Sequence, residues 1–306
     1  MDSNDPLKLV SAFFEEVWND GNFGFIDEHY ASDFTLHALW QNTALGGGGE
    51  ADRETAKQVI AVWRDAMSDL FLTIEEAFVD GDMVVMRHTC GGTHDNVLMG
   101  IPPTDLFGEI TGVTMTRVAG GRITDAWTCW DALYMLQQLG VRPGPPLFPN
   151  GAERFAVADR REGDQDANRA VVARLYEDLW NQADPPAVAE LVAEDCITHA
   201  PGPPLLHGPD GMAAFIGVWR TAFPDGVMTV DAMYSADDRV ATRFRFEGTH
   251  TGPLAVIEPS GKRVTVGGMA ITRVVDRKVV SHWCEIDRAG VMAQIDGELV
   301  ATSEAV

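Results

Sequence analysis

Apolar residues recur along the first half of the chain at helical spacing and then at strand spacing. The first helical run ends at Gly21 and carries its apolar side chains at Leu7, Val10, Phe13, Phe14, Val17 and Trp18. A short helix over 23–31, a strand over 33–39 and a helix over 52–67 follow. Four strands then alternate with glycine-containing turns, over 71–79, 83–93, 110–118 and 122–130, before a last helix that ends at Gly140. Helices followed by an antiparallel meander predict an α+β domain whose strands curl around the helices and leave a cavity.

The same succession of elements occurs twice. With a shift of 156 positions, residues 63–131 fall on 219–287 without a gap, and 20 of the 69 paired positions are identical. Upstream the shift becomes 162, so that "VWN" at 17–19 pairs with "LWN" at 179–181. The difference of six residues lies around the Gly-rich stretch "LGGGGE", which predicts a longer loop in the first copy. A repeat of this length is a domain with its own core rather than a solenoid unit.

The repeat sets the domain boundaries. We expect a first domain over 1–140, a linker over 141–166, a second domain over 167–297 and a tail over 298–306. The linker is rich in Pro, Gly and charged residues and has no sustained periodicity. In each domain an asparagine, Asn19 or Asn181, follows the first helix, where a C-terminal capping role is expected.

Composition narrows the class of protein. The 306 residues are 45% hydrophobic, and no apolar run approaches the roughly 20 residues that span a bilayer. The polar, acidic start has no signal-peptide pattern, and the four cysteines have no ligand spacing, so a cytoplasmic protein with buried free thiols is expected. The net charge is −23, and both halves are acidic, which argues against nucleic acid and anionic membranes as partners.

Several motifs together point to one family. The "WN" pair is followed by a histidine after the first strand, by "HGPDG" at 207–211, "FPD" at 223–225 and "GTHTG" at 248–252, and in the first copy by "GIPPT" at 100–104. In each copy a tryptophan also stands four residues before an aspartate. The chain resembles the SnoaL-like polyketide cyclases of the NTF2-like, ketosteroid-isomerase-like superfamily. The resemblance implies two tandem cone-shaped α+β domains, each with helices packed on a curved, mostly antiparallel sheet. It also implies that the two sheets pair as an intramolecular pseudo-dimer, and further homo-oligomers are compatible with it.

The two copies depart from the family pattern in different ways. The first copy has "GGGGEAD" where "HGPDG" would stand, and "MSD" at 67–69 in place of "FPD". The second keeps both motifs and replaces the glycine of "GIPP" with Val256. On these motifs the second copy is the better candidate for activity.

Two aspartates are the first candidates for catalysis. Asp131 and Asp287 each end a strand, and period-two alternation places them on the same face as Trp127 and Trp283. A carboxyl beside an indole is poorly solvated, which suits a general acid or base near neutral pH. The resemblance implies that an aspartate here removes a proton from an activated carbon and returns one to an oxygen. An alternative is that each aspartate caps the helix that follows it.

Histidines and tryptophans supply the other candidate site residues. His94 and His250 follow "GT" at the end of a long strand, where a neutral imidazole can bind a substrate carbonyl or simply a backbone group. His37, His199 and His207 are candidates for substrate binding, and Trp127 and Trp283 for pocket walls.

The sequence contains no metal-binding, dinucleotide-binding or P-loop motif and no nucleophile elbow, so we expect chemistry without a cofactor or metal. The function expected is a cofactor-independent polyketide cyclase-like lyase or isomerase. It would catalyse aldol closure or a related proton transfer on a hydrophobic carbonyl compound. Hydrolysis or epoxide opening, isomerisation, and non-catalytic binding of an apolar small molecule are the alternatives.

Overall fold

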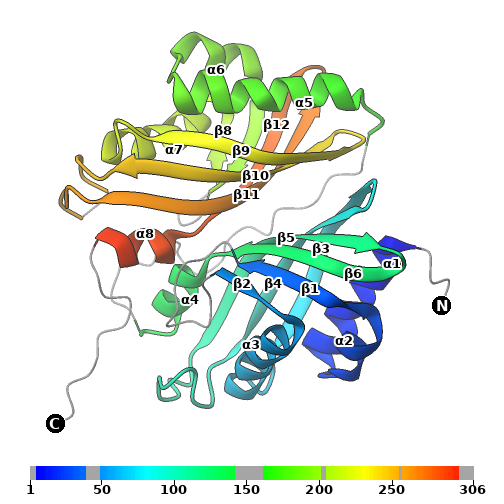
Figure 1. Cartoon of the computed structure of the whole chain (residues 1–306). Coiled ribbons are helices and arrows are strands. Elements are labelled where there is room, and N and C mark those ends of the chain that lie inside the picture. Colours follow the sequence, from blue (N-terminus) through cyan, green and yellow to red (C-terminus); the bar gives the residue numbers. More distant parts are fainter. Residues whose placement is uncertain (1–4, 39–48, 142–160, 201–204, 255–256, 296–306) are drawn as a thin grey trace. The chain divides into compact units, whose positions relative to one another are not determined.

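The computed structural model describes residues 5–38, 49–141, 161–200, 205–254 and 257–295. It divides into two compact units, 1–146 with 298–306, and 147–297, and each is described by itself (Figure 1). Most of the expected linker, 142–160, and the whole tail lie outside the described residues. The expected packing of the two sheets as a pseudo-dimer stays a prediction.

Domain one is an α+β domain with a six-stranded mixed sheet in the order β2-β1-β6-β5-β4-β3. Only β1 and β6 run parallel among its described pairs. Helices lie against the sheet (Figure 1). The elements are α1 Pro6–Phe13, α2 Gly24–His29, β1 Tyr30–Ala38, β2 Gly49–Ala51, α3 Arg53–Ala66, β3 Phe71–Asp80, β4 Met83–Thr93, β5 Phe107–Ala119, β6 Arg122–Trp130 and α4 Ala132–Gln138.

Domain two repeats this architecture, with the strand order β8-β7-β12-β11-β10-β9. Its elements are α5 Gln165–Arg174, α6 Pro185–Leu191, β7 Val192–His199, β8 Leu206–His207, α7 Gly208–Ala222, β9 Val227–Ala236, β10 Arg239–Thr249, β11 Arg263–Val275, β12 Lys278–Ile286 and α8 Arg288–Ile295. The prediction of two tandem α+β domains is confirmed. The four cysteines are free and buried, as expected. No described helix is both long and apolar enough to cross a bilayer.

The "WN" motif joins a helix to a strand. In both domains the first helix widens into a π-helical turn, Phe14–Asn19 (η1) and Leu175–Asn181 (η3). The Asn19 side chain accepts a hydrogen bond from the Leu72 N–H at 2.7 Å and donates one to its carbonyl at 3.0 Å. Asn181 forms the same pair with Met228, at 2.8 and 3.0 Å. The expected helix cap is therefore wrong, because the amide satisfies backbone groups at the start of β3 and β9 instead.

A ring on one strand covers a glycine on the next strand in both domains. His88 on β4 is the register partner of Gly112 on β5, and a Cβ built on Gly112 would lie 2.5 Å from the His88 Cε1. In domain two the ring is Phe244, and it covers Gly268. Neither glycine has a positive φ, so the backbone conformation does not require glycine there. The close approach of the ring does require it.

The two sequence-predicted aspartates stand at the N-termini of the last helices. Asp131 is the N-cap of α4, and its Oδ1 accepts a hydrogen bond from the Tyr134 N–H at 3.1 Å. Asp287 accepts from the Gly290 N–H at 2.7 Å, and its carboxylate fills the space that a Cβ of residue 290 would need. Both aspartates are buried, with 4% and 1% exposure. This is the geometry expected if each aspartate caps the helix that follows it.

We expect Gly112→Ala to destabilise domain one by about 1–3 kcal/mol, because the added methyl group overlaps the His88 ring. Urea unfolding followed by tryptophan fluorescence measures the change. Gly217→Ala is the control, because Gly217 lies within α7 with no atom in the way of a Cβ. That control should stabilise the protein by about 0.4–1 kcal/mol. A Gly112→Ala protein as stable as the wild type would contradict the contact.

We expect Asp131→Ala and Asp287→Ala each to lower the free energy of unfolding by about 0.5–2 kcal/mol, and the Asn variants by less, because Asn is also a good N-cap. Thermal unfolding tests this. Turnover of the Asn variants separates capping from catalysis. If either aspartate is the general acid or base, its Asn variant loses about 10²–10⁴-fold in turnover with nearly unchanged stability.

Candidate functional site

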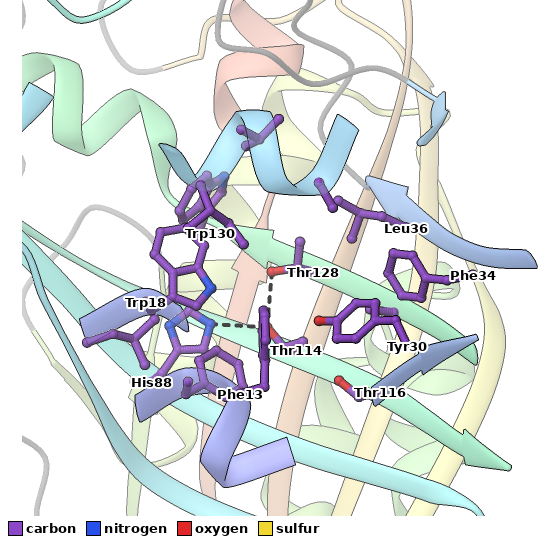
Figure 2. A pocket seen from close by; sticks show the side chains of 16 residues that line it. Phe13, Trp18, Tyr30, Phe34, Leu36, His88, Thr114, Thr116, Thr128 and Trp130 are labelled. Carbon is purple, nitrogen blue, oxygen red and sulfur yellow. Dashed lines mark hydrogen bonds between the residues drawn. The ribbon is translucent and has the colours of Figure 1, made fainter. Parts of the chain in front are cut away.

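A cavity opens inside domain one between the helices and the concave face of the sheet. The space free of atoms here is about 660 Å³ when the part open to solvent is counted with it. Its walls are mainly aromatic and aliphatic (Figure 2). The lining residues are Phe13, Phe14, Trp18, Tyr30, Phe34, Leu36, Ala56, Val59, Ile60, Leu72, His88, Thr114, Thr116, Ala126, Thr128 and Trp130.

One wall of the cavity carries a chain of three polar side chains on adjacent strands. The His88 Nε2 lies 3.1 Å from the Thr114 Oγ1, and that hydroxyl lies 3.1 Å from the Thr128 Oγ1 (Figure 2). The chain runs from β4 across β5 to β6, because His88 pairs beside Gly112 and Thr114 is the register partner of Thr128. Sheet pairing thus fixes the order of the three groups.

His88 is an uncharged imidazole at neutral pH. It is 3% exposed, and burial, with a smaller contribution from the Arg87 charge, lowers its pKa to about 4. Its Nδ1 has no hydrogen-bond partner. The Phe14 ring lies 5.5 Å away between ring centroids. The imidazole therefore has one nitrogen engaged with Thr114 and one without a protein partner.

Tyr30 brings a second hydroxyl to the cavity. It starts β1, is 4% exposed, and directs its hydroxyl into the cavity (Figure 2). Among the described residues this hydroxyl has no hydrogen-bond partner. Burial raises the pKa of the phenol well above 10, so the group stays protonated and can donate to a ligand.

Domain two lacks these polar groups at the equivalent positions. The counterparts of Tyr30, His88, Thr114 and Thr128 are Val192, Phe244, Ala270 and Cys284. The polar side chains in the interior of domain two are different and bind each other. Tyr176 lies 2.5 Å from the Thr242 hydroxyl, and the His282 Nδ1 lies 2.9 Å from the Thr272 hydroxyl. The interiors of the two domains have therefore diverged.

None of the residues predicted from the sequence as site residues in domain one lines this cavity. Trp127 and His37 alternate with lining residues and stack on each other on the opposite face of the sheet, with ring centroids 4.6 Å apart. His37 also contacts Asp125 at 3.2 Å, and the Arg117 guanidinium covers the Trp127 ring. Trp283 and His199 form the matching stack in domain two, at 3.5 Å. His207 is exposed at the start of α7, without a capping hydrogen bond from its side chain.

The recurring Gly-Thr-His sequence fixes a loop in each domain. The Thr93 N–H and hydroxyl both donate to the Asp69 carboxylate, at 2.6 and 2.8 Å, and Thr249 does the same with Asp225. The backbone of His94 then bonds Leu106 and Thr104 across the loop, while its Nδ1 pairs with the Thr104 hydroxyl at 3.1 Å.

His250 holds the equivalent loop of domain two. The Ser260 N–H donates to the His250 Nδ1 at 3.2 Å, so the imidazole is neutral with its proton on Nε2. Both histidines are fully buried, and burial lowers the pKa of each. Their Nε2 atoms have no partner. The geometry around Nδ1 is that of a loop anchor in both domains.

Sequence reasoning missed Tyr30, His88, Thr114 and Thr128. It gave weight to residues that the two copies share, whereas these four differ between the copies. A comparison of the two copies at every second strand position, where the side chains share one face of the sheet, would have found them. Among the described residues, no three His, Cys, Asp or Glu side chains are grouped as a metal ion would require.

The chain is similar to several proteins of known structure. IdmH, a proposed polyketide cyclase from Streptomyces antibioticus, is 31% identical over 45% of this chain and 100% of its own, with a TM-score of 0.40. TsrD from Streptomyces laurentii is 26% identical over 45% of this chain and 100% of its own, with a TM-score of 0.41. A proposed polyketide cyclase from Acidithiobacillus ferrooxidans is 29% identical over 46% and 98%, with a TM-score of 0.39. A search of curated protein sequences found no match.

The family model for SnoaL-like polyketide cyclases matches residues 8–139 and again residues 170–295. These two segments correspond to the two α+β domains and together take up well over half of the chain. The chain therefore belongs to the SnoaL-like polyketide cyclase family, with two copies of the family's domain in tandem.

Proposed function

We propose that the protein is a cofactor-independent cyclase-type enzyme whose reaction site is the cavity of domain one. The substrate is a neutral, hydrophobic carbonyl compound of polyketide type, and the reaction is aldol closure or a related proton transfer. The observation that carries the proposal is an aromatic cavity with a neutral imidazole and four hydroxyl groups on its walls, those of Tyr30, Thr114, Thr116 and Thr128.

Apolar walls favour a neutral ligand, because burying an unpaired charge among aromatic rings costs several kcal/mol. No Asp, Glu, Lys or Arg is among the described lining residues. Hydrolysis by paired carboxylates therefore has less support than proton transfer. Six of the lining residues are Phe, Trp or Tyr, and their rings offer flat surfaces for a ring-containing substrate.

His88 is the residue that we assign to proton transfer. The activated carbon gives its proton to the imidazole, and the resulting enolate attacks the second carbonyl. The imidazolium then returns the proton to the alkoxide that forms. A pKa of about 4 makes the imidazole a weak base, which suits an already acidified methylene, and makes the imidazolium a strong acid for the return step.

Domain one, rather than domain two, carries the reaction in this proposal. The motif comparison gave more weight to domain two, but Phe244, Ala270 and Cys284 stand there in place of the three members of the polar chain. The acid/base role expected for Asp131 and Asp287 stays a prediction, and their Asn variants test it.

Filling the cavity should abolish activity without unfolding the protein. Ala56→Met with Val59→Phe introduces the residues that domain two carries as Met212 and Phe215. We expect this variant to lose at least about 10-fold in the rate of deuterium exchange at the methylene of ethyl 2-naphthoylacetate in D2O, measured by NMR. Met212→Ala is the control, which should lose about 2–5 kcal/mol of stability and keep the exchange rate. Undiminished exchange by the filled variant would refute the site.

Replacing the imidazole tests its assigned role. His88→Phe copies domain two, whose Phe244 packs on a glycine in the same way, so we expect it to fold. The exchange rate should fall by about 10²–10⁴-fold. His282→Ala, which copies Ala126, is the control and should leave the rate unchanged. If the wild type binds 2-naphthol in the cavity but exchanges no faster than buffer, the protein is a binder and the proposal fails.

A further inference from the structure

The polar chain in the cavity of domain one has a definite direction. The His88 Nδ1 is buried without a partner. A buried N–H without an acceptor is rarer and costlier than a buried lone pair without a donor. We place the proton of the neutral imidazole on Nε2, which then donates to the Thr114 hydroxyl at 3.1 Å.

The order of donor and acceptor set at His88 continues through Thr114 to Thr128. Because the Thr114 oxygen accepts from His88, its own hydrogen is free to point to the Thr128 oxygen, 3.1 Å away. The hydrogen of Thr128 then has no acceptor among the described residues. Thr128 lines the cavity, so this hydrogen is available to a ligand (Figure 2).

We propose that the Thr128 hydroxyl donates a hydrogen bond to the carbonyl oxygen of the substrate as that oxygen gains negative charge, and that Thr114 is the positioning residue that orients it. This assignment rests on the proposed function for the identity of the reacting oxygen. It adds a hydrogen-bond donor for the enolate to the base already assigned.

The chain couples the base to the donor. When the imidazole of His88 takes the carbon-bound proton, it becomes a cation and its Nε2–H becomes a stronger donor to Thr114. Polarisation passes along connected hydrogen bonds, so the Thr128 donor strengthens as the enolate oxygen becomes negative. A donor that strengthens in the charged state stabilises that state more than the ground state.

Domain two supports the assignment by contrast. Domain two has no imidazole and neither hydroxyl of this chain of side chains, because Phe244, Ala270 and Cys284 stand at the three positions. Thr116, which also lines the cavity, is retained as Thr272 and is not part of the chain. The three members of the chain are thus present together in one domain and absent together in the other.

The test uses 2-naphthol, whose neutral and ionised forms have separate emission bands, as a probe for an enolate-like oxygen. The full-length protein is titrated with it at several pH values to give the affinity for each form. We expect Thr128→Val to weaken binding of the ionised form by about 10- to 100-fold and of the neutral form by less than about 3-fold, since a hydrogen bond to a charged oxygen is the stronger one.

Further variants separate orientation from general damage. Thr128→Ser keeps the hydroxyl and should recover ionised-form binding to within roughly 3-fold of the wild type. Thr114→Val should weaken the ionised form by roughly 3- to 10-fold, because it leaves Thr128 in place without its orienting partner. Thr73→Val is the matched control and should change both affinities less than roughly 2-fold, because Thr73 is exposed on β3 and does not line the cavity.

Equal weakening of both forms by Thr128→Val, or an effect of Thr73→Val as large as that of Thr128→Val, would overturn the assignment. The readout is binding, so it is independent of deuterium exchange. A wild type that prefers the ionised form but has no exchange activity would refute the proposed function and leave the assignment of Thr128 standing.

Discussion

The hydrogen bonding available inside each domain depends on the contact between a ring on one central strand and a glycine on the next. In domain one the ring is the imidazole of His88, and in domain two it is the phenyl ring of Phe244. Because the glycine holds both rings in the same place, exchanging one for the other changes chemistry without changing the fold. The imidazole reaches Thr114 and, through it, Thr128, whereas a phenyl ring offers no hydrogen bond to pass on.

Much of the fold could be predicted from the sequence. Strands over 71–79 and 122–130 were expected from apolar alternation and turn signals, and the structure has them over Phe71–Asp80 and Arg122–Trp130. β1 starts at Tyr30, earlier than the expected residue 33, because its first residue pairs with Ile123 in a parallel ladder that local sequence does not indicate. The widened turn at Phe14–Asn19 could not be predicted either, because its helical spacing reads as an ordinary helix.

The candidate site was harder to predict, and the reason is physical. Residues kept in both copies, such as Thr93, His94 and Asp69, hold the same loop in each of the two domains, so a structural role is enough to explain their repetition. In the proposed function the residues inside the cavity face the substrate, and two copies with different ligands or roles have no reason to keep them alike. The face of each side chain also depends on register: Leu36 lines the cavity, while His37, one residue later, stacks on Trp127 on the other side.

Each domain also buries an imidazole on its sheet, in addition to its loop histidine, and this makes acid a shared weakness with two separate origins. Burial lowers the pKa of both His88 and His282 from 6.5 to about 4. The unfolded chain therefore binds more protons than the folded one between these values, so stability falls as the pH drops from 6.5 towards 4 and is fully retained above 6.5. The loss can reach about 3 kcal/mol for each imidazole. The two domains thus share this response to acid, although the responsible side chain lies on β4 in one and on β12 in the other.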